Sequence, residues 1–218
     1  MSPVAFEVLG VRVETYAAVP TLMFRLRITA ADDTPVHAII LRSQIMIEPQ
    51  RRRYSSDEEA RLNELFGNAP RWGDTLRPFL WTNLATTVTG FTGSTEVDLP
   101  VTCTYDFEIA SVKYMHSLEG GEIPIVALFS GTVFAKSPVQ GSPAQGMSVS
   151  PVSWSEEASF RLPVGVWREM MDLYFPDTAW LRLQRETLDA LQHYKVQRAL
   201  RTWDETFELL LKEAGEDA

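Results

Sequence analysis

The stretch that decides the fold is Val101-Thr102-Cys103-Thr104-Tyr105-Asp106-Phe107-Glu108-Ile109, in which apolar and polar residues alternate without a break. Side chains on a strand repeat every two residues, so the odd-numbered residues share one face and the even-numbered residues the other. The stretch therefore predicts a strand with one face in a core and the other in water. Cys103, the only cysteine, lies on the apolar face and is expected to be a buried small hydrophobic residue, not a nucleophile.

The same theme recurs along most of the chain. Strands are predicted over residues 6–13, 22–29, 36–47, 79–88, 101–114, 123–134 and 152–162. A bulge is expected at Leu9-Gly10, and short connections make the first three strands antiparallel neighbours. The segment 123–134 is apolar on both faces, which is typical of a covered central strand. Prolines and glycines over 137–151 predict a loop.

Helical spacing appears in three segments. Residues 55–59, Ser-Ser-Asp-Glu-Glu, offer two overlapping capping boxes for a short helix that Gly67 would end, since either serine can pair with the glutamate three residues later. A second helix is predicted over 166–174, stopping before Pro176. The last, 188–212, has apolar residues at steps of four and three. The fold class is therefore predicted as α+β: a mainly antiparallel sheet of six to seven strands with a short mid-chain helix and a helical C-terminal segment.

Composition is that of an ordinary globular protein, with 45% hydrophobic and 22% charged residues. The 218 residues are predicted to form a single domain, a β-rich core over 1–162 and a helical tail over 163–218. The net charge of −9 argues against general nucleic-acid binding. No signal peptide is visible, and no stretch approaches the ~20 apolar residues of a spanning helix. A cytoplasmic location without membrane insertion is the expectation.

Residues that carry reaction chemistry are sparse and scattered. His37, His116 and His193 lie in different predicted elements, with no second histidine or carboxylate at ligand spacing. Motifs for a nucleophilic serine, a zinc protease, a phosphate-binding loop or a dinucleotide are absent. A single cysteine permits neither an intrachain disulfide nor a cysteine-based zinc site. The sequence therefore predicts no catalytic residue, no metal and no cofactor.

One candidate for protein binding is the basic segment formed by Arg51, Arg52, Arg53 and Tyr54, which runs against the net charge. A solvated loop explains it. The functional alternative is docking to an acidic partner surface, because arginine makes bidentate bonds to carboxylates. Tyr54 alone does not make a stacking platform for nucleic acid.

A second candidate is the aromatic content of the last helical segment, represented by Trp203 and Phe207. Such residues either belong to the core or form a partner-binding patch, where Trp and Tyr are enriched. A terminal helix with a wide apolar stripe must cover a sheet, or bind another protein or a second copy of itself. Both outcomes are compatible with the sequence.

The last third of the chain resembles the end of SecB-type export chaperones in the order of its segments. The residues that carry this likeness are Arg161-Leu162-Pro163-Val164, Tyr174-Phe175-Pro176 and residues 180–191. In that family a strand leads into a helix, a Phe-Pro turn, an alternating apolar segment and an Asp-Ala-Leu helix. This chain departs from the pattern with more strands upstream and a longer final helix. The resemblance implies an antiparallel sheet with helices on one face, self-association and binding of unfolded or partly folded protein. It transfers no catalytic residue.

Over its full length the chain also resembles an uncharacterised, actinobacterial-type family of unknown function associated with gene clusters for nickel–iron hydrogenases. The stretches that carry this likeness are residues 20–28, 71–81 and 129–134. The resemblance implies an accessory or assembly role beside such an enzyme. It does not imply metal chemistry in this chain, which lacks cysteine clusters for iron–sulfur or nickel sites.

Together these observations favour a non-catalytic protein-binding factor, chaperone-like or assembly-related, with an unidentified protein partner and self-association as a further expectation. The alternative is an enzyme or small-ligand binder with a pocket assembled from distant residues, lined by Trp72 and Trp81 and using Asp74 or Asp106. A purely structural subunit of a larger complex is a third reading. A deep pocket with converging carboxylates would favour the second reading, and a flat apolar groove the first.

Overall fold

The computed structural model describes residues 2–31, 34–104, 106, 109–138, 145–176, 178 and 181–215. The chain divides into two compact units, residues 1–179 and 180–218. The predicted start of a helical tail at residue 163 differs from this division. The helix α4 (Val164–Tyr174) belongs to the first unit, where it packs on β1, β2 and β8.

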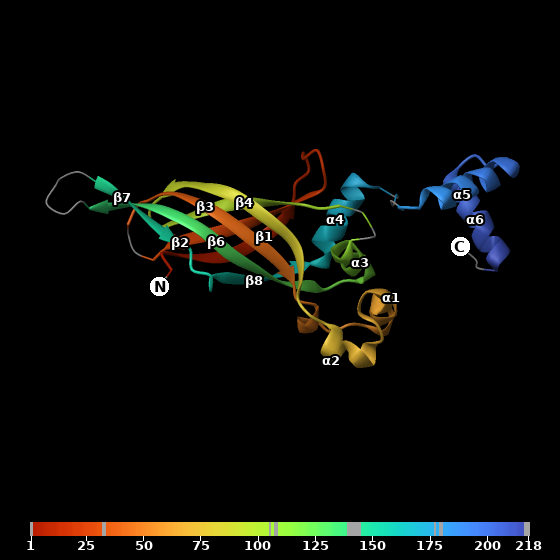
Figure 1. Cartoon of the computed structure of the whole chain (residues 1–218), viewed down its shortest axis with the longest axis horizontal. Coiled ribbons are helices and arrows are strands. Elements are labelled where there is room, and N and C mark those ends of the chain that lie inside the picture. Colours follow the sequence, from red (N-terminus) through yellow and green to blue (C-terminus); the bar gives the residue numbers. More distant parts are fainter. Residues whose placement is uncertain are drawn as a thin grey trace. The chain divides into compact units, whose positions relative to one another are not determined.

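Eight described strands form two antiparallel sheets in the first unit (Figure 1). The smaller sheet has the order β1-β2-β5, with bounds Val4–Val13, Thr21–Ala30 and Ser94–Thr102. The larger has the order β4-β3-β6-β7, with β8 also paired to β6; its bounds are Phe79–Phe91, Val36–Ile47, Glu122–Pro138, Gln145–Pro151 and Glu157–Pro163. The predicted α+β class with a mainly antiparallel sheet is confirmed, with eight strands in place of six to seven.

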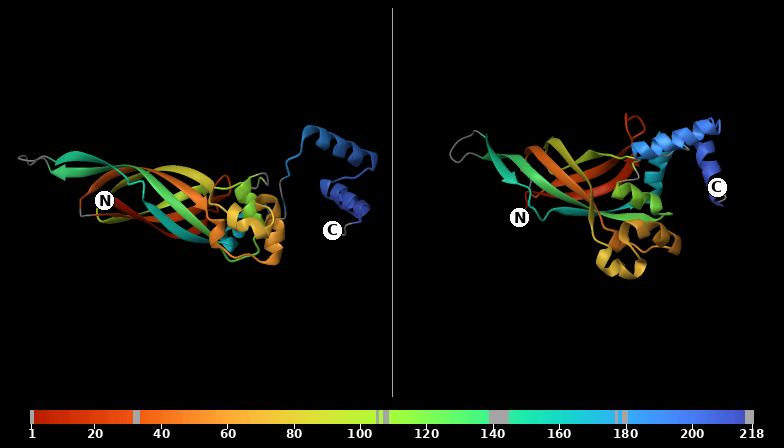
Figure 2. Two further views of the ribbon diagram at one scale, coloured as in Figure 1. Left: turned by 60° about the horizontal axis from the view of Figure 1, so that its bottom comes forward. Right: turned by 45° about the vertical axis from the view of Figure 1, so that its right-hand side comes forward.

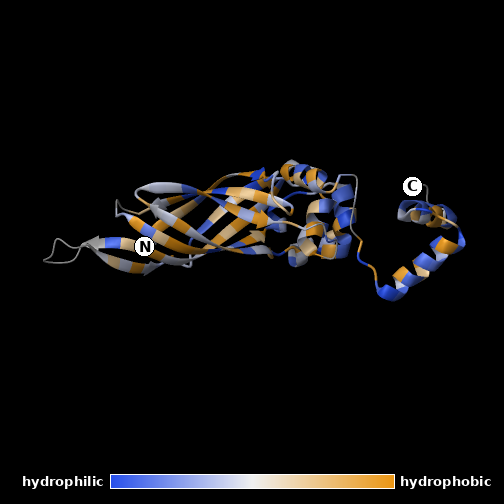
Figure 3. Cartoon of the chain, turned by 90° about the horizontal axis from the view of Figure 1, so that it is seen from above, coloured by the Kyte–Doolittle hydropathy of each residue, from blue (hydrophilic) through white to orange (hydrophobic). Residues whose placement is uncertain are grey.

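Alternating side chains explain why the two sheets lie against each other. Along β3, buried residues such as Ile39 and Leu41 alternate with exposed ones, and Figure 3 shows apolar and polar residues mixed in the same way along the strands. The inner faces meet through aromatic rings: Phe6 stacks on Phe129 with centroids 4.2 Å apart, and Phe24 meets Trp81 at 6.0 Å. The core of the first unit therefore lies between the sheets.

Helices cover one end of the sheets, while β7 lies at the other end (Figure 2). The helical end consists of η1 (Pro49–Arg51), α1 (Ser56–Phe66), η2 (Ala69–Arg71), α2 (Trp72–Thr75) and α3 (Ala110–Ser117), together with α4 (Figure 1). The second unit holds α5 (Arg185–Gln197) and α6 (Trp203–Ala214). None of the helices in the described part of the chain combines the length and the apolar character needed to cross a membrane.

Several local predictions are confirmed. The register of β1 shifts between Val8 and Gly10, where the bulge was expected. The first capping box is the one formed: the Glu58 amide lies 3.2 Å from the Ser55 hydroxyl, and the Ser55 amide lies 3.1 Å from the Glu58 carboxylate. The helix α4 ends at Tyr174, two residues before Pro176. The strand β6 is central, with β3 on one side and β7 and β8 on the other.

The deciding stretch itself is only partly a strand. Val101 and Cys103 are buried as predicted, but β5 ends at Thr102, Ile109 is exposed, and residues 110–114 of the predicted strand 101–114 belong to α3. Tyr105, Phe107 and Glu108 lie outside the described residues. The predicted strand was wrong at residues 110–114 because the buried residues of α3, Ser111, Val112, Tyr114 and Met115, follow helical spacing and pack as one face.

Four further predictions were wrong. The third strand does not pair with the second; β3 pairs with β4 and β6 in the other sheet. The predicted loop 137–151 contains β7, with residues 139–144 outside the description, and the strand that follows begins at Glu157, not at residue 152. The predicted single helix 188–212 is two helices, α5 and α6.

Candidate functional site

The basic segment places its three arginines in different surroundings. Arg52 is the buried one, with its side chain 10% exposed. Its guanidinium donates to the Glu58 carboxylate at 2.6 Å and to the backbone carbonyls of Gly120 and Glu122 at 2.7 and 2.8 Å. Arg51, by contrast, is exposed and pairs with Glu48 at 3.0 Å. Arg52 therefore fastens α1 to the connection between α3 and β6.

Tyr54 is also turned inward. Its hydroxyl donates to the Pro49 carbonyl at 2.7 Å and lies 2.8 Å from the Tyr114 hydroxyl. Burial raises the pKa of Tyr54, and it raises the pKa of Tyr114 to about 12, so both phenols stay neutral near pH 7. Tyr54 belongs to a cluster of aromatic rings that meet mostly edge to face: Tyr54, Phe66, Trp72, Phe79 and Tyr114.

The four residues of the basic segment therefore do not form one patch. Arg51 and Arg53 are exposed, whereas Arg52 and Tyr54 bond within the protein. Among these four, only Arg51 and Arg53 present their side chains to an acidic partner. Whether they bind one stays a prediction.

Two more arginines hold the C-terminal end of α3. Arg61 donates to the Ser117 carbonyl at 3.0 Å and pairs with Glu119 at 2.9 Å, while Arg168 donates to the Leu118 carbonyl. Cations at this end of a helix satisfy its free carbonyls and oppose its dipole. Burial and the nearby Arg168 and Arg61 guanidinium groups lower the pKa of His116.

This lowered pKa predicts a pH dependence. The unfolded chain takes up a proton near the ordinary value of 6.5, before folded His116 does, so stability falls as the pH drops through and below that value. In His116→Gln this contribution is absent. We expect the melting temperature of the variant to fall less than that of the wild type between about pH 7 and about pH 5. Equal slopes in thermal denaturation would contradict the prediction.

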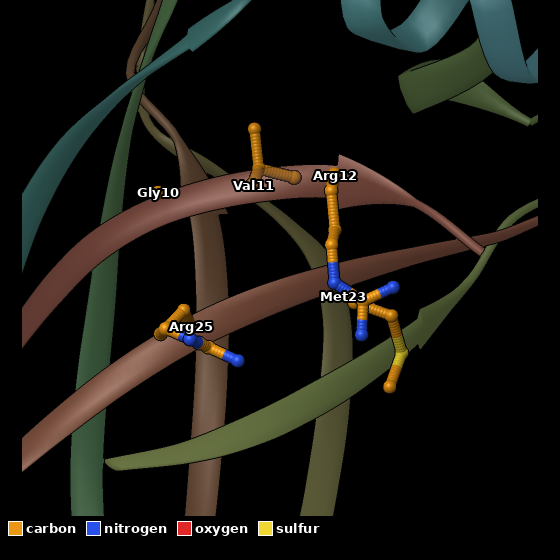
Figure 4. Close-up of a pocket in the computed structure, with 5 residues that line it drawn as sticks. All are labelled: Gly10, Val11, Arg12, Met23 and Arg25. Carbon is orange, nitrogen blue, oxygen red and sulfur yellow. The ribbon is translucent and has the colours of Figure 1, made fainter.

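A shallow pocket of about 260 Å³ lies on the outer face of the smaller sheet, lined by Gly10, Val11, Arg12, Met23 and Arg25. Figure 4 shows Arg12 reaching from β1 across to β2 beside Met23. The arginines already bind carboxylates of the same sheet: Arg12 lies 3.0 Å and Arg25 3.2 Å from Asp98. Hydrogen bonds from Arg25 and Arg12 lower the pKa of Asp98. The two arginines that line the pocket are thus already paired with carboxylates, at a solvated surface of the sheet.

The residues expected to line an assembled ligand pocket lie elsewhere. Trp72 is buried, and its indole donates to the Gly67 carbonyl at 2.8 Å. Trp81 instead contacts Phe24 between the sheets. Asp74 is exposed on α2, and Asp106 lies between β5 and α3. The two tryptophans therefore take part in different clusters, and neither is among the residues of the pocket on β1 and β2.

Other candidates for chemistry are equally separate. His37 is exposed on β3, and His193 lies on α5 with its ring nitrogen 2.8 Å from Gln197. Burial raises the pKa of Cys103 to about 12, which keeps the thiol protonated. Within the described ranges, no group of three or more His, Cys, Asp or Glu residues is placed to hold a metal ion.

The second unit presents a different surface, which we call the helix pair (α5 and α6, residues 185–214). Trp203 and Phe207 lie one turn apart on α6, with ring centroids 6.2 Å from each other, and Lys195 of α5 lies 5.6 Å from the Trp203 ring. Trp203 is exposed and Phe207 is half-buried. Thr206 is the single buried residue of the described helix pair. The helix pair therefore has no apolar core of its own.

Local sequence explains why the predicted single helix breaks. Ala199 adopts a positive φ of 53°, and the amides of Ala199 and Leu200 return to carbonyls in the last turn of α5. Thr202 and Glu205 then form a capping box that starts α6, with hydrogen bonds of 3.1 and 3.3 Å. This Thr-x-x-Glu signal is visible in the sequence. The apolar spacing nevertheless predicts one continuous helix, because it runs on in phase through the turn.

Comparison with known families places the chain. The model of a family of unknown function, DUF6084, matches residues 1–218. The chain belongs to the DUF6084 family. The expected membership in a family of unknown function is thereby confirmed. The association with hydrogenase gene clusters and the likeness to SecB-type chaperones stay predictions for this DUF6084 protein.

Two other comparisons add nothing to the function of the DUF6084 protein. A search of curated proteins found no match. A solved structure, a β-glucosidase from Kluyveromyces marxianus, matches with 6% identity and a TM-score of 0.26, over 73% of this chain and 15% of that one. The chain spans a small part of that enzyme's length, and a likeness at this TM-score carries no argument.

Proposed function

We propose that this DUF6084 protein is a non-catalytic, chaperone-like accessory or assembly factor that binds a protein partner through its helix pair. The observation that carries the proposal is the lack of an apolar core in the described part of the second unit, residues 181–215. Leu188, Val196, Trp203 and Leu211 are exposed. A helical segment this short is not stable on its own unless a disulfide, a bound metal or a surface to pack on stabilises it.

The geometry of α6 supports a helix-in-groove mode of binding. Trp203, Phe207 and Leu210 recur at steps of four and three and form one stripe. The opposite face is acidic, with Asp204, Glu205 and Glu208. Amphipathic helices of this kind place such anchors in an apolar groove of the partner, and aromatic anchors carry most of the binding energy.

The choice of first partner rests on the resemblance to a family associated with nickel–iron hydrogenase gene clusters. Hydrogenase subunits are therefore the first candidates. The chaperone-like part of the proposal rests on the resemblance to SecB-type proteins, and predicts preference for a subunit that has not yet assembled.

The test measures binding of the full chain to purified hydrogenase subunits, alone and assembled, together with crosslinking mass spectrometry in the native host. We expect crosslinks from the helix pair. We expect the double variant Trp203→Ser/Phe207→Ser to weaken binding by about 30-fold, which corresponds to a combined loss of about 2 kcal/mol for the two residues.

A matched control is available in the first unit. Tyr16 and Trp154 are the most exposed aromatic residues of the described chain, and Tyr16→Ser/Trp154→Ser removes comparable apolar surface. We expect this control to bind within about twofold of the wild type, as surface changes outside an interface do. Equal weakening by the two double variants would overturn the helix pair as the binding site, and absence of any crosslinked partner would overturn the proposed function.

A further inference from the structure

The strand β7 is an edge strand with an unusual composition. It pairs with β6 along Gln145–Pro151 and has no described strand on its other side. The remaining sheet edges face each other, since β1 lies beside β8 and β4 beside β5. Edge strands are normally protected by charges, prolines, bulges or short length. The seven residues of β7 contain no charge, and their single proline, Pro151, is the last residue of the strand.

Hydrogen bonding shows which groups of β7 face outward. The Val152 amide donates to the Gly131 carbonyl at 3.0 Å. Because backbone groups alternate sides along an antiparallel strand, those of Ser150 and Ser148 face β6. The backbone groups of Met147 and Val149 therefore face the open edge.

The side chains at this edge are apolar and solvent-exposed. Met147 is 59% and Val149 is 61% exposed. Val149 lies opposite Phe134 of β6, whose own neighbour on β3 is Ala38, and Ile40 of β3 is also exposed on the same face. The open backbone edge thus borders an apolar strip on the larger sheet.

We propose that β7 is a self-association edge, at which β7 of a second copy adds antiparallel to this strand. A two-fold axis at Ser148, the middle residue of β7, lets the full strand overlap with itself. Met147 then lies opposite Val149 of the second copy, and the outward backbone groups of the two pair with one another. The larger sheet continues across the axis.

A second copy fits this edge better than an unrelated chain because the strand is complementary to itself. Without charges on β7, the two-fold arrangement brings no like charges together, and both exposed apolar side chains find an apolar partner. One seven-residue edge is a small interface. The dimer is accordingly weak, with a Kd of about 10–500 μM.

The experiment is sedimentation velocity of the full chain over about 5 μM to about 1 mM, a range that spans such an affinity. Two variants separate the proposed geometry from others. In Met147→Lys/Val149→Lys, like charges oppose each other twice across the axis. In Met147→Glu/Val149→Lys, each new carboxylate faces the new ammonium group of the second copy. Both variants replace the same two exposed residues, so each is the other's control for folding.

We expect the dilysine variant to raise the Kd at least about tenfold and the glutamate–lysine variant to stay within about threefold of the wild type. The variant Trp203→Ser/Phe207→Ser is expected to dimerise like the wild type, which separates this edge from the helix pair. A wild type that remains monomeric throughout, or the same Kd for both charged variants, would overturn the proposal. Dimerisation lost only with the Trp203 and Phe207 substitutions would also overturn it.

Discussion

Replacing Arg52 with methionine is expected to lower the free energy of unfolding by about 3–5 kcal/mol, because it leaves a buried carboxylate without its cation. The side chain of Glu58 is only 5% exposed. It would keep the amides of Ser55 and Glu119 as partners but lose the guanidinium. The carbonyls of Gly120 and Glu122 would lose donors as well. Chemical denaturation near pH 7 measures the effect.

The neighbouring residue is the matched control for this prediction. Arg51→Met makes the same substitution at a side chain that is 57% exposed and pairs with Glu48. Ion pairs at the surface contribute about 0–1 kcal/mol, so little change is expected. The double variant Arg52→Met/Glu58→Met should recover part of the loss, since it removes the uncompensated charge. Equal effects at Arg51 and Arg52 would show that the Glu58 carboxylate is solvated without Arg52.

Replacing Gly131 with alanine is expected to lower the free energy of unfolding by about 4 kcal/mol, combining overpacking with a strained backbone. Gly131 has a φ of 151°, and an added Cβ would overlap the carbonyl oxygen of Ile40 and lie 3.1 Å from its carbon. That carbonyl belongs to β3, paired with β6 along both strands. The two backbones have to separate to admit the methyl group.

Gly10→Ala tests whether the effect is specific to this position. Gly10 also lies in a strand, but a Cβ there meets nothing within 4 Å and its φ is not positive. We expect a change within about 1 kcal/mol, since alanine then only restricts the unfolded chain. Both variants can be compared by urea denaturation. A Gly131→Ala variant as stable as Gly10→Ala would mean that β3 and β6 separate at little cost.

Two kinds of strand could be predicted from the sequence: strands with persistent alternation, such as β3, and a strand that is apolar on both faces, such as β6. The strand β3 has the predicted bounds, Val36–Ile47, because every second residue over most of it is buried. In the stretch 101–114 the apolar–polar alternation continues to Ile109, yet β5 ends at Thr102, and the burial of Val112 and Met115 depends on α3. The end of that helix is held by two arginines that lie 56 and 50 residues along the chain from the carbonyls they bind, which no local pattern reveals.

The sequence identified candidate binding residues one by one, but it could not show which of them are exposed or lie together. In the sequence Arg52 cannot be distinguished from the two arginines beside it. Its carbonyl partners lie about seventy residues later in the chain, and only the fold places them next to it. Trp203 and Phe207 share one face at the predicted spacing, although the helix that carries them starts at Trp203. The open edge at Met147 and Val149 lay in a predicted loop. Its pairing with β6 depends on register, which composition does not encode.

The sequence by itself determined the fold class, the family and the absence of known catalytic motifs, since these depend on local periodicity and residue identity. Only the tertiary structure decided which sheet each strand joins, which arginine is buried, and which apolar surfaces stay exposed. The physical reason is that pairing and burial are set by partners distant in the chain. Alternating residues specify that a strand has an apolar face, but not what covers it.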